Sequence, residues 1–319
     1  MPIRCLALFG CLIAASQVTA AEVQYDVREK IVYSQVGERE LLMDAFVPKD
    51  EGTYPAVLVV HGGAWRSGSR IQLRGYAIAL ARMGFVCFAI DYRLAPKHKF
   101  PAQIEDCRAA VKWIRENGSK YKADTTKLGA IGYSAGGHLV SLLATTGEAP
   151  SEQNGNIDTR IQCCVAGGAP TDFRFFPDQG NWAEYWMGGN LKTEPEKFRL
   201  ASSTAFVDSA DPPTFFFNGT SDTLVPVTWS ENCYTALKEA GVRTEMYTIQ
   251  GAGHMQAASD PIALKKAYEF LQEELKPTKA KTSEEATNET KPTSKKTVTD
   301  SEQPEEEAES PSLTEAVEN

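Results

Sequence analysis

Apolar runs and amphipathic stretches alternate along most of this chain. Apolar runs bounded by polar residues predict buried strands at Ala56–Val60, Phe85–Ile90, Leu128–Ile131, Ile161–Ala166, Thr214–Phe217 and Thr244–Ile249. Apolar residues at helical spacing predict helices at Gln72–Met83, Ile104–Asn117, His138–Thr145, Thr228–Ala240 and Pro261–Leu275. Strands that alternate with helices predict an α/β domain with a mostly parallel central sheet flanked by helices on both faces.

Two segments depart from this alternation. Val23–Tyr33 and Leu41–Val47 are β-like runs in direct succession, which predict a hairpin at the start of the domain. Gly168–Leu200 is rich in aromatic residues and shows no regular period, so we expect an irregular insert there.

The two ends of the chain differ in composition from the part between them. Residues 1–21 contain Arg4, an apolar stretch and a small-residue pattern, which predict a signal peptide cleaved near Ala20 or Ala21. The apolar stretch is shorter than the roughly 20 residues that span a bilayer, and a buried N-terminal helix is the alternative. Residues 276–319 lack aromatic residues and predict a disordered, acidic, low-complexity tail. Residues 22–275 are long enough for one large domain.

Charge and cysteine content narrow the class of protein. The net charge is −9, and the tail, with 11 acidic and 6 basic residues, holds −5 of it. This balance gives no support for nucleic-acid binding. The five cysteines after residue 21 are odd in number and lack a CxxC spacing, which argues against a disulfide framework or a zinc site, although one disulfide remains open. We expect no metal and no cofactor. We also predict export to the periplasm or beyond, without stable membrane insertion; the oligomeric state is unknown.

A serine lies between glycines where a predicted strand meets a predicted helix. Gly132-Tyr133-Ser134-Ala135-Gly136 has the G-x-S-x-G form of a nucleophile elbow, a sharp turn that exposes the serine hydroxyl. The alternative is a plain glycine-rich turn, because the motif also arises by chance. Since ligands bind beyond the carboxyl ends of parallel strands, this turn is the first candidate for a reactive site.

A serine nucleophile needs a base, and the chain has only four histidines. His61 and His138 lie inside glycine motifs, where structural hydrogen bonding is expected, and His98 lies between two lysines in a predicted solvated loop. His254 follows the last predicted strand in a glycine-rich loop that we expect to be flexible, from which it would reach Ser134.

The acid that would orient this base has one favoured candidate and one rival. Asp222 follows the predicted strand Thr214–Phe217, and its alternative role is an Asx turn. Asp172 is the rival, although it leads into the irregular insert. Asp91 precedes Ser134 in the chain, and we expect it to brace a loop through Arg93 instead.

A tetrahedral intermediate also needs donors for its oxyanion. The backbone N–H groups of Gly62 and Gly63 are candidates, together with that of Ala135, which follows the serine. The segment His61-Gly62-Gly63 is otherwise a tight turn or a phosphate loop, but no Walker lysine and no G-x-G-x-x-G accompany it.

Five motifs in one order resemble those of the α/β-hydrolase carboxylesterases of the hormone-sensitive-lipase-like and feruloyl/acetyl-esterase-like families. They are His61–Ala64, Asp91–Pro96, Gly132–Gly137, Ser221–Pro226 and Gly251–His254. The resemblance covers about residues 40–275 and implies an α/β-hydrolase fold. It also implies Ser134 as nucleophile, His254 as base and Asp222 as acid, with Gly62, Gly63 and Ala135 as oxyanion donors. Ala64-Trp65 replaces the third glycine of the lipase-like motif, which favours the feruloyl/acetyl-esterase-like branch.

The substrate pocket is expected to be aromatic. We predict that it is lined by Trp65, Tyr133, Trp182 and Trp186, with further aromatic residues of the insert near Trp65. Such a cluster is otherwise part of the core. Aromatic walls suit a sugar ring or an aromatic acyl group, so we predict hydrolysis of short acyl esters, acetyl or feruloyl, on a small-molecule or polysaccharide substrate. The alternatives are a serine peptidase or amidase of the same fold and a non-catalytic binding module.

Overall fold

The computed structural model describes residues 23–149, 151, 158–175 and 182–275. In these ranges eight strands form one sheet in the order β1-β2-β4-β3-β5-β6-β7-β8. The strands are β1 (Tyr25–Val36), β2 (Arg39–Pro48), β3 (Tyr54–Val60), β4 (Val86–Ile90), β5 (Ala123–Tyr133), β6 (Cys163–Gly167), β7 (Thr214–Gly219) and β8 (Thr244–Ile249). The predicted opening hairpin is confirmed, because β1 pairs with β2 antiparallel. From β4 to β8 all neighbours are parallel.

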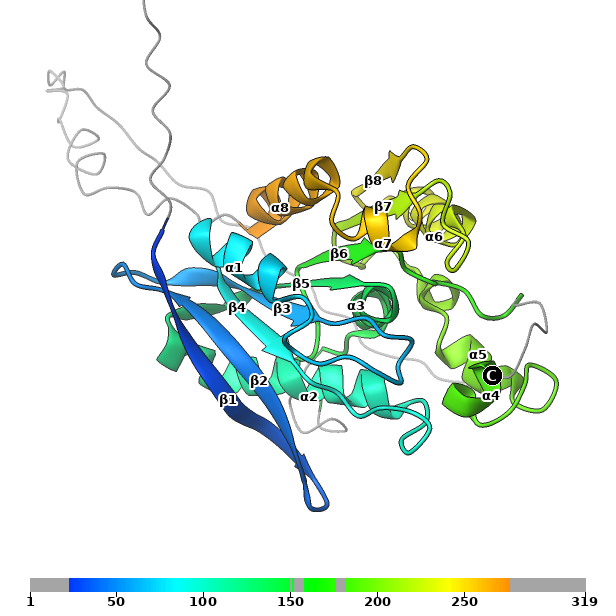
Figure 1. The fold of residues 1–319 in the computed structure, drawn as a ribbon, viewed down its shortest axis with the longest axis horizontal. Helices are drawn as coiled ribbons and strands as arrows, with labels where there is room; N and C mark the ends of the chain where they lie inside the picture. Colours follow the sequence, from blue (N-terminus) through cyan, green and yellow to red (C-terminus); the bar gives the residue numbers. More distant parts are fainter. Residues whose placement is uncertain (1–22, 150, 152–157, 176–181, 276–319) are drawn as a thin grey trace, which may run out of the picture. The chain divides into compact units, whose positions relative to one another are not determined.

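Helices cover both faces of the sheet (Figure 1). The longer ones are α1 (Arg74–Arg82), α2 (Ala102–Asn117), α3 (Ala135–Thr146), α6 (Val227–Glu239) and α8 (Pro261–Leu275). The apolar sides of α2, α3 and α6 pack on one face of the sheet, and those of α1 and α8 pack on the other. This is the predicted three-layer arrangement, with an apolar core on each side of the sheet.

The segment Gly168–Leu200, expected to be irregular, contains two short helices. These are α4 (Trp182–Met187) and α5 (Pro195–Leu200), and a third short helix, α7 (His254–Ala257), follows β8. Trp186 and Phe198 are buried in the core, so tertiary packing stabilises α4 and α5 although their sequences show no sustained helical period. Two short 3₁₀ helices, η1 (Gly118–Tyr121) and η3 (Ser203–Phe206), complete the described elements.

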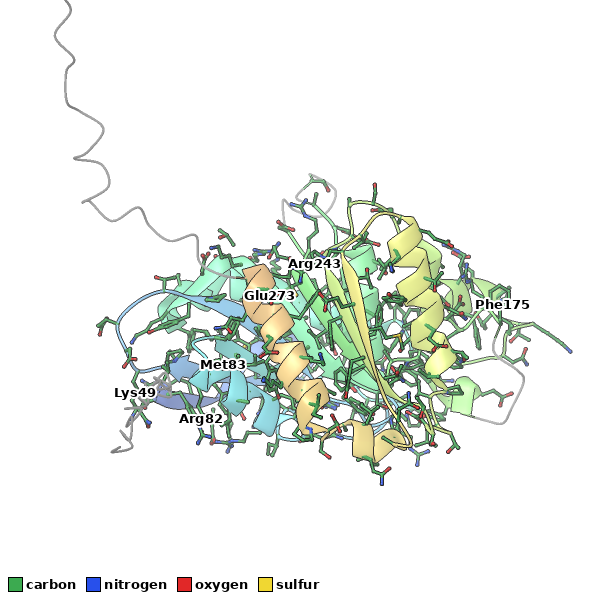
Figure 2. All side chains as sticks on the ribbon, turned by 90° about the horizontal axis from the view of Figure 1, so that it is seen from above. Lys49, Arg82, Met83, Phe175, Arg243 and Glu273 are labelled. Atoms are coloured by element: carbon green, nitrogen blue, oxygen red, sulfur yellow. The ribbon has the colours of Figure 1, made fainter. Side chains whose placement is uncertain are left out.

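Three further features complete the description of the fold. The five described cysteines are buried and free, so none of them forms a disulfide. At the far end of the sheet from the elbow, Arg243 precedes β8 and forms an ion pair of 2.8 Å with Glu273 of α8 (Figure 2). Within the described ranges, no helix has the length and apolar character needed to cross a membrane.

Candidate active site

Ser134 is the single residue between the end of β5 and the start of α3. Its backbone has φ 58° and ψ −123°, a combination that an L-residue adopts only under strain. Such strain at the strand-to-helix turn is the feature expected of a nucleophile elbow. The backbone N–H of Ser134 donates to Gly167 O at 2.8 Å, which fixes the turn to the neighbouring strand β6.

Close backbone contacts explain the glycine at position 136 of the elbow. A Cβ atom on Gly136 would collide with the carbonyl oxygen of Val60, because α3 begins directly against the end of β3. Gly62, in the loop after β3, also lies against the elbow: a Cβ there would be 3.2 Å from the Cβ of Ser134. The two glycine motifs, 70 residues apart, therefore touch at the serine.

His254 hydrogen-bonds to both Ser134 and Asp222. Its Nδ1 lies 2.6 Å from Asp222 Oδ2, and its Nε2 lies 2.9 Å from Ser134 Oγ. Because a carboxylate is an acceptor only, Nδ1 carries the proton and Nε2 accepts from the serine hydroxyl. His254 is the first residue of α7, so the loop expected to be flexible ends at the histidine in a short helix.

Asp222 uses its two carboxylate oxygens for two purposes. Oδ1 accepts the backbone N–H groups of Leu224 and Val225, at 2.9 and 2.8 Å, which is an Asx turn. Oδ2 is left for His254, and the carboxylate is fully buried. The sequence offered two alternative roles for Asp222, an Asx turn or the orientation of His254. In the structure Asp222 has both roles.

The other two aspartates have arginine partners. Asp172 pairs with Arg174 at 2.6 Å and has no contact with His254. The prediction that Asp91 braces a loop through Arg93 is wrong in its partner. Asp91 binds Arg70 at 2.7 Å, whereas Arg93 binds Asp106 of α2 at 2.8 Å. The backbone N–H of Arg93 also donates to Asp106, so Arg93 is held by α2, while the backbone N–H of Arg70 donates to Asp91.

Arg70 fastens the loop that carries Gly62 and Gly63 to the sheet. Its guanidinium also binds Asp44 of β2 at 2.8 Å, and Asp44 is almost completely buried. The loop is thereby tied to β2 and to the end of β4. A rigid loop is what a backbone oxyanion site requires, since its donors must be aligned before the reaction.

Two of the three other histidines, His61 and His138, are buried near the elbow. His61 stacks on Tyr92 with ring centroids 4.1 Å apart, and burial lowers its pKa. His138 is completely buried, which lowers its pKa to about 4 and keeps it neutral. It accepts the indole N–H of Trp65 at 3.1 Å and donates to Ala201 O at 2.7 Å. Both support the structure around the elbow, as expected from the sequence.

Two cavities meet at Ser134 and His254. The smaller, about 280 Å³, is lined by Ala64, Trp65, Ser134, Ala135, Pro170, Tyr185, Leu224, Val225, Trp229 and His254. The larger, about 550 Å³, is lined by residues of the loop after β3, of α1 and of α7, together with Tyr133 and Leu224. A third cavity of about 700 Å³, between α1 and α8, touches no member of the Ser134–His254–Asp222 chain.

The predicted pocket residues have three different outcomes. Trp65 lines the smaller cavity, and Tyr133 lines the larger one while its hydroxyl donates to His254 O. Trp186 was predicted wrongly: it is fully buried beneath Trp65, with the two rings stacked 3.7 Å apart, and it reaches neither cavity. Its size made it a good core residue, which residue type alone does not distinguish from a pocket wall. The side chain of Trp182 lies outside the described part of the chain.

Several lining residues were missed by the sequence reasoning. They are Leu224, Val225 and Trp229, which follow Asp222 closely. The signal for the first two was available, because an Asx turn at Asp222 places the next residues beside its carboxylate. Tyr185 of α4 is one of the insert aromatic residues expected near Trp65, and it lines the smaller cavity.

A strained serine, a histidine and a buried aspartate, linked by hydrogen bonds at the carboxyl edge of this sheet, define a serine hydrolase with the α/β-hydrolase fold. Within that class the chain belongs to the BD-FAE family of esterases, which matches residues 43–237. This confirms the branch that Ala64-Trp65 favoured.

Named relatives agree with this assignment. Esterase LipC of Mycobacterium tuberculosis is 32% identical over 245 residues, or 72% of this chain and 60% of LipC. The carboxylic ester hydrolase LipM of the same organism, described as probable, is 33% identical over 205 residues, or 61% of this chain and 48% of LipM. The chain therefore spans about half to 60% of the length of these relatives.

Solved structures share the fold. A truncated carbohydrate esterase from gut microbiota superposes with a TM-score of 0.72 over 81% of this chain and 99% of that one, at 22% identity. Esterase Est2 of Thermogutta terrifontis, with propionate bound, has a TM-score of 0.65 at 26% identity, over 81% of this chain and 97% of that one. Est2 has also been solved phosphorylated by paraoxon.

Proposed function

We propose that the protein is a serine carboxylesterase that hydrolyses short-acyl esters, of acetyl or feruloyl type, on a carbohydrate. The observation that carries this proposal is the hydrogen-bonded chain from Ser134 through His254 to Asp222, at the meeting point of two cavities. The family, and the carbohydrate esterase with the same fold, support the choice of substrate class.

In the proposed reaction Ser134 Oγ attacks the ester carbonyl carbon, and His254 Nε2 takes the hydroxyl proton. Asp222 holds the imidazole in the required tautomer and stabilises the imidazolium that forms. The backbone N–H groups of Gly62, Gly63 and Ala135 stabilise the oxyanion. Collapse of the intermediate expels the alcohol, which takes the proton from His254, and water then hydrolyses the acyl-enzyme on Ser134 by the same steps in reverse.

Each of the two cavities would hold one part of the ester, the acyl group or the alcohol. The smaller one is walled by Trp65, Tyr185 and Trp229 and lies at the lower limit of the roughly 300–1,000 Å³ typical of ligand pockets, so it suits a short or flat acyl group. The larger one has about twice the volume, and Ser67, Gln72 and Ser259 supply hydroxyl and amide groups to its lining, so it suits a sugar alcohol.

A fluorophosphonate probe tests the nucleophile. We expect the wild-type protein and the Ser141→Ala control to be labelled and Ser134→Ala to remain unlabelled. Ser141 is a suitable control because it is buried in α3 and bonds to His138 O, away from the cavities. A folded wild-type protein that resists the probe would support the non-catalytic alternative.

A substrate panel tests the acyl group. We expect p-nitrophenyl acetate to be cleaved faster than the palmitate ester, and acetylated xylan and methyl ferulate to identify the natural acyl type. Equal rates on acetate and palmitate would contradict the short-acyl assignment. Cleavage of aminoacyl p-nitroanilides without cleavage of esters would favour the peptidase alternative.

We also propose that the protein is exported. The support is the pattern of residues 1–21, with Arg4 ahead of an apolar stretch and small residues before Ala21. Mass measurement of the intact protein from culture fractions tests this. A mature N-terminus near Ala21 is expected, and a cytoplasmic product that retains residue 1 would contradict it.

A further inference from the structure

Arg66 is the only arginine, lysine, aspartate or glutamate among the described residues that line the larger cavity. It is exposed, and no described carboxylate forms an ion pair with it. Acidic residues outnumber basic ones in the chain, 42 to 33, and the nearby Arg70 is paired twice. An arginine that shares a cavity with Ser134 and forms no ion pair with the described residues is available to bind a negatively charged group.

The surroundings of Arg66 hold it in place. Its guanidinium carbon lies 5.5 Å from the centre of the Tyr185 ring, within the range of a cation–π contact. The Tyr185 hydroxyl donates to Ala64 O at 2.9 Å, and Trp65, stacked on Trp186, lies between Ala64 and Arg66 in the chain. The arginine is therefore attached to a rigid part of the loop, which lowers the entropy lost when it binds a ligand.

We propose that Arg66 binds a carboxylate on the alcohol part of the substrate, so that the preferred esters are those of acidic saccharides built from uronic acid units. The inference rests on the proposed function and on the assignment of the larger cavity to the alcohol. A guanidinium fits a carboxylate through two parallel hydrogen bonds, a geometry that a neutral sugar does not offer.

A matched pair of acetate esters tests the proposal. 4-Acetoxybenzoate carries a carboxylate on its leaving group, and 4-acetoxybenzamide is its neutral counterpart. The ratio of kcat/KM for the anionic ester to that for the neutral ester is measured in wild-type protein, Arg66→Gln and Arg66→Lys. We expect the ratio to fall about tenfold in Arg66→Gln, with the neutral ester changed less than twofold, because a hydrogen bond to a charged group is lost. The ratio in Arg66→Lys is expected to lie between those of the wild-type protein and Arg66→Gln. An ammonium group keeps the positive charge but cannot form the two parallel hydrogen bonds of a guanidinium.

The control is Arg74→Gln. Arg74 is also a partly exposed arginine, but it pairs with Glu29 and does not line the cavity. In Arg74→Gln the ratio of kcat/KM for the anionic ester to that for the neutral ester is expected to equal that of the wild-type protein. An equal ratio in Arg66→Gln and the wild-type protein, both active, would overturn the inference and leave the proposed function intact.

A second pair of esters tests which side of the substrate bears the charge. 4-Nitrophenyl hydrogen succinate has its carboxylate on the acyl part, and 4-nitrophenyl butyrate is the neutral reference. We expect Arg66→Gln to leave this ratio unchanged. A fall confined to the succinyl ester would overturn the placement on the alcohol. If the wild-type protein hydrolyses none of the four esters, the proposed function fails and the inference fails with it.

Discussion

Replacing Asp222 in two ways separates the tasks of its two oxygens. In Asp222→Asn the amide oxygen still accepts the N–H groups of Leu224 and Val225, while the NH₂ group faces His254. A donor there forces the proton of the imidazole onto Nε2, so the histidine no longer accepts from Ser134. The same change in a serine protease lowers kcat about 10⁴-fold, and we expect a loss of that order here.

Asp222→Ala removes the turn as well. The N–H groups of Leu224 and Val225 lose their acceptor, and Val225 is buried, so we expect a cost of about 2–4 kcal/mol for two unmade hydrogen bonds. In a domain of this size that lowers Tm by about 5–12 °C. The asparagine variant is expected to unfold within about 2 °C of the wild-type protein.

Thermal unfolding and p-nitrophenyl acetate hydrolysis, measured on both variants, check this reasoning. The expected pattern is equal loss of activity with unequal loss of stability. If Asp222→Asn and Asp222→Ala unfold at the same temperature, the Asx turn contributes nothing to stability. If Asp222→Asn keeps more than about a tenth of the activity, the acid does not set the tautomer of His254.

Three further predictions follow from the buried surroundings of the site. The pKa of His138 is about 4 in the folded protein and 6.5 when exposed, so its stability contribution is present above pH 6.5 and is lost as the pH falls towards 4. Between pH 7.5 and 5 this is about 2 kcal/mol, and urea unfolding at both pH values should show that difference shrinking in His138→Gln. Gly136→Ala should yield little folded, active protein on expression, because its Cβ meets Val60 O, whereas Gly75→Ala, open at that point of α1, should raise Tm slightly. Arg70→Gln leaves two aspartates without their partner and should cost about 3–5 kcal/mol in urea unfolding.

Most elements of the fold follow from local sequence pattern. β8 and α8 match their predicted bounds residue for residue, because each has a sustained apolar period and clear breakers at its ends. The short helices α4 and α5 do not follow in this way. Each is six residues long, too short to be stable alone, and each forms only where Trp186 or Phe198 packs into the core.

The candidate site likewise contains residues that local sequence predicts and residues whose positions depend on tertiary contacts. Ser134, Asp222 and His254 each follow the end of a strand by only a few residues. The short connection restricts where each side chain can lie. The partners of Asp91 and the orientation of Trp186 depend instead on contacts between distant segments. A carboxylate and an aromatic ring each have several physically suitable partners, and residue type does not choose among them.

The contacts between the two glycine motifs explain why they occur together. Trp65, in the first motif, donates its indole N–H to His138, in the second, and Gly62 lies against Ser134. The loop that supplies the proposed oxyanion donors is thus bonded to the helix that begins at the nucleophile. A substitution at His138 that removes this hydrogen bond should let Trp65 and the donor loop shift relative to Ser134. A lower kcat together with a higher KM is then the expected kinetic result, since Trp65, the hydrogen-bond partner of His138, also walls the smaller cavity that would hold the acyl group.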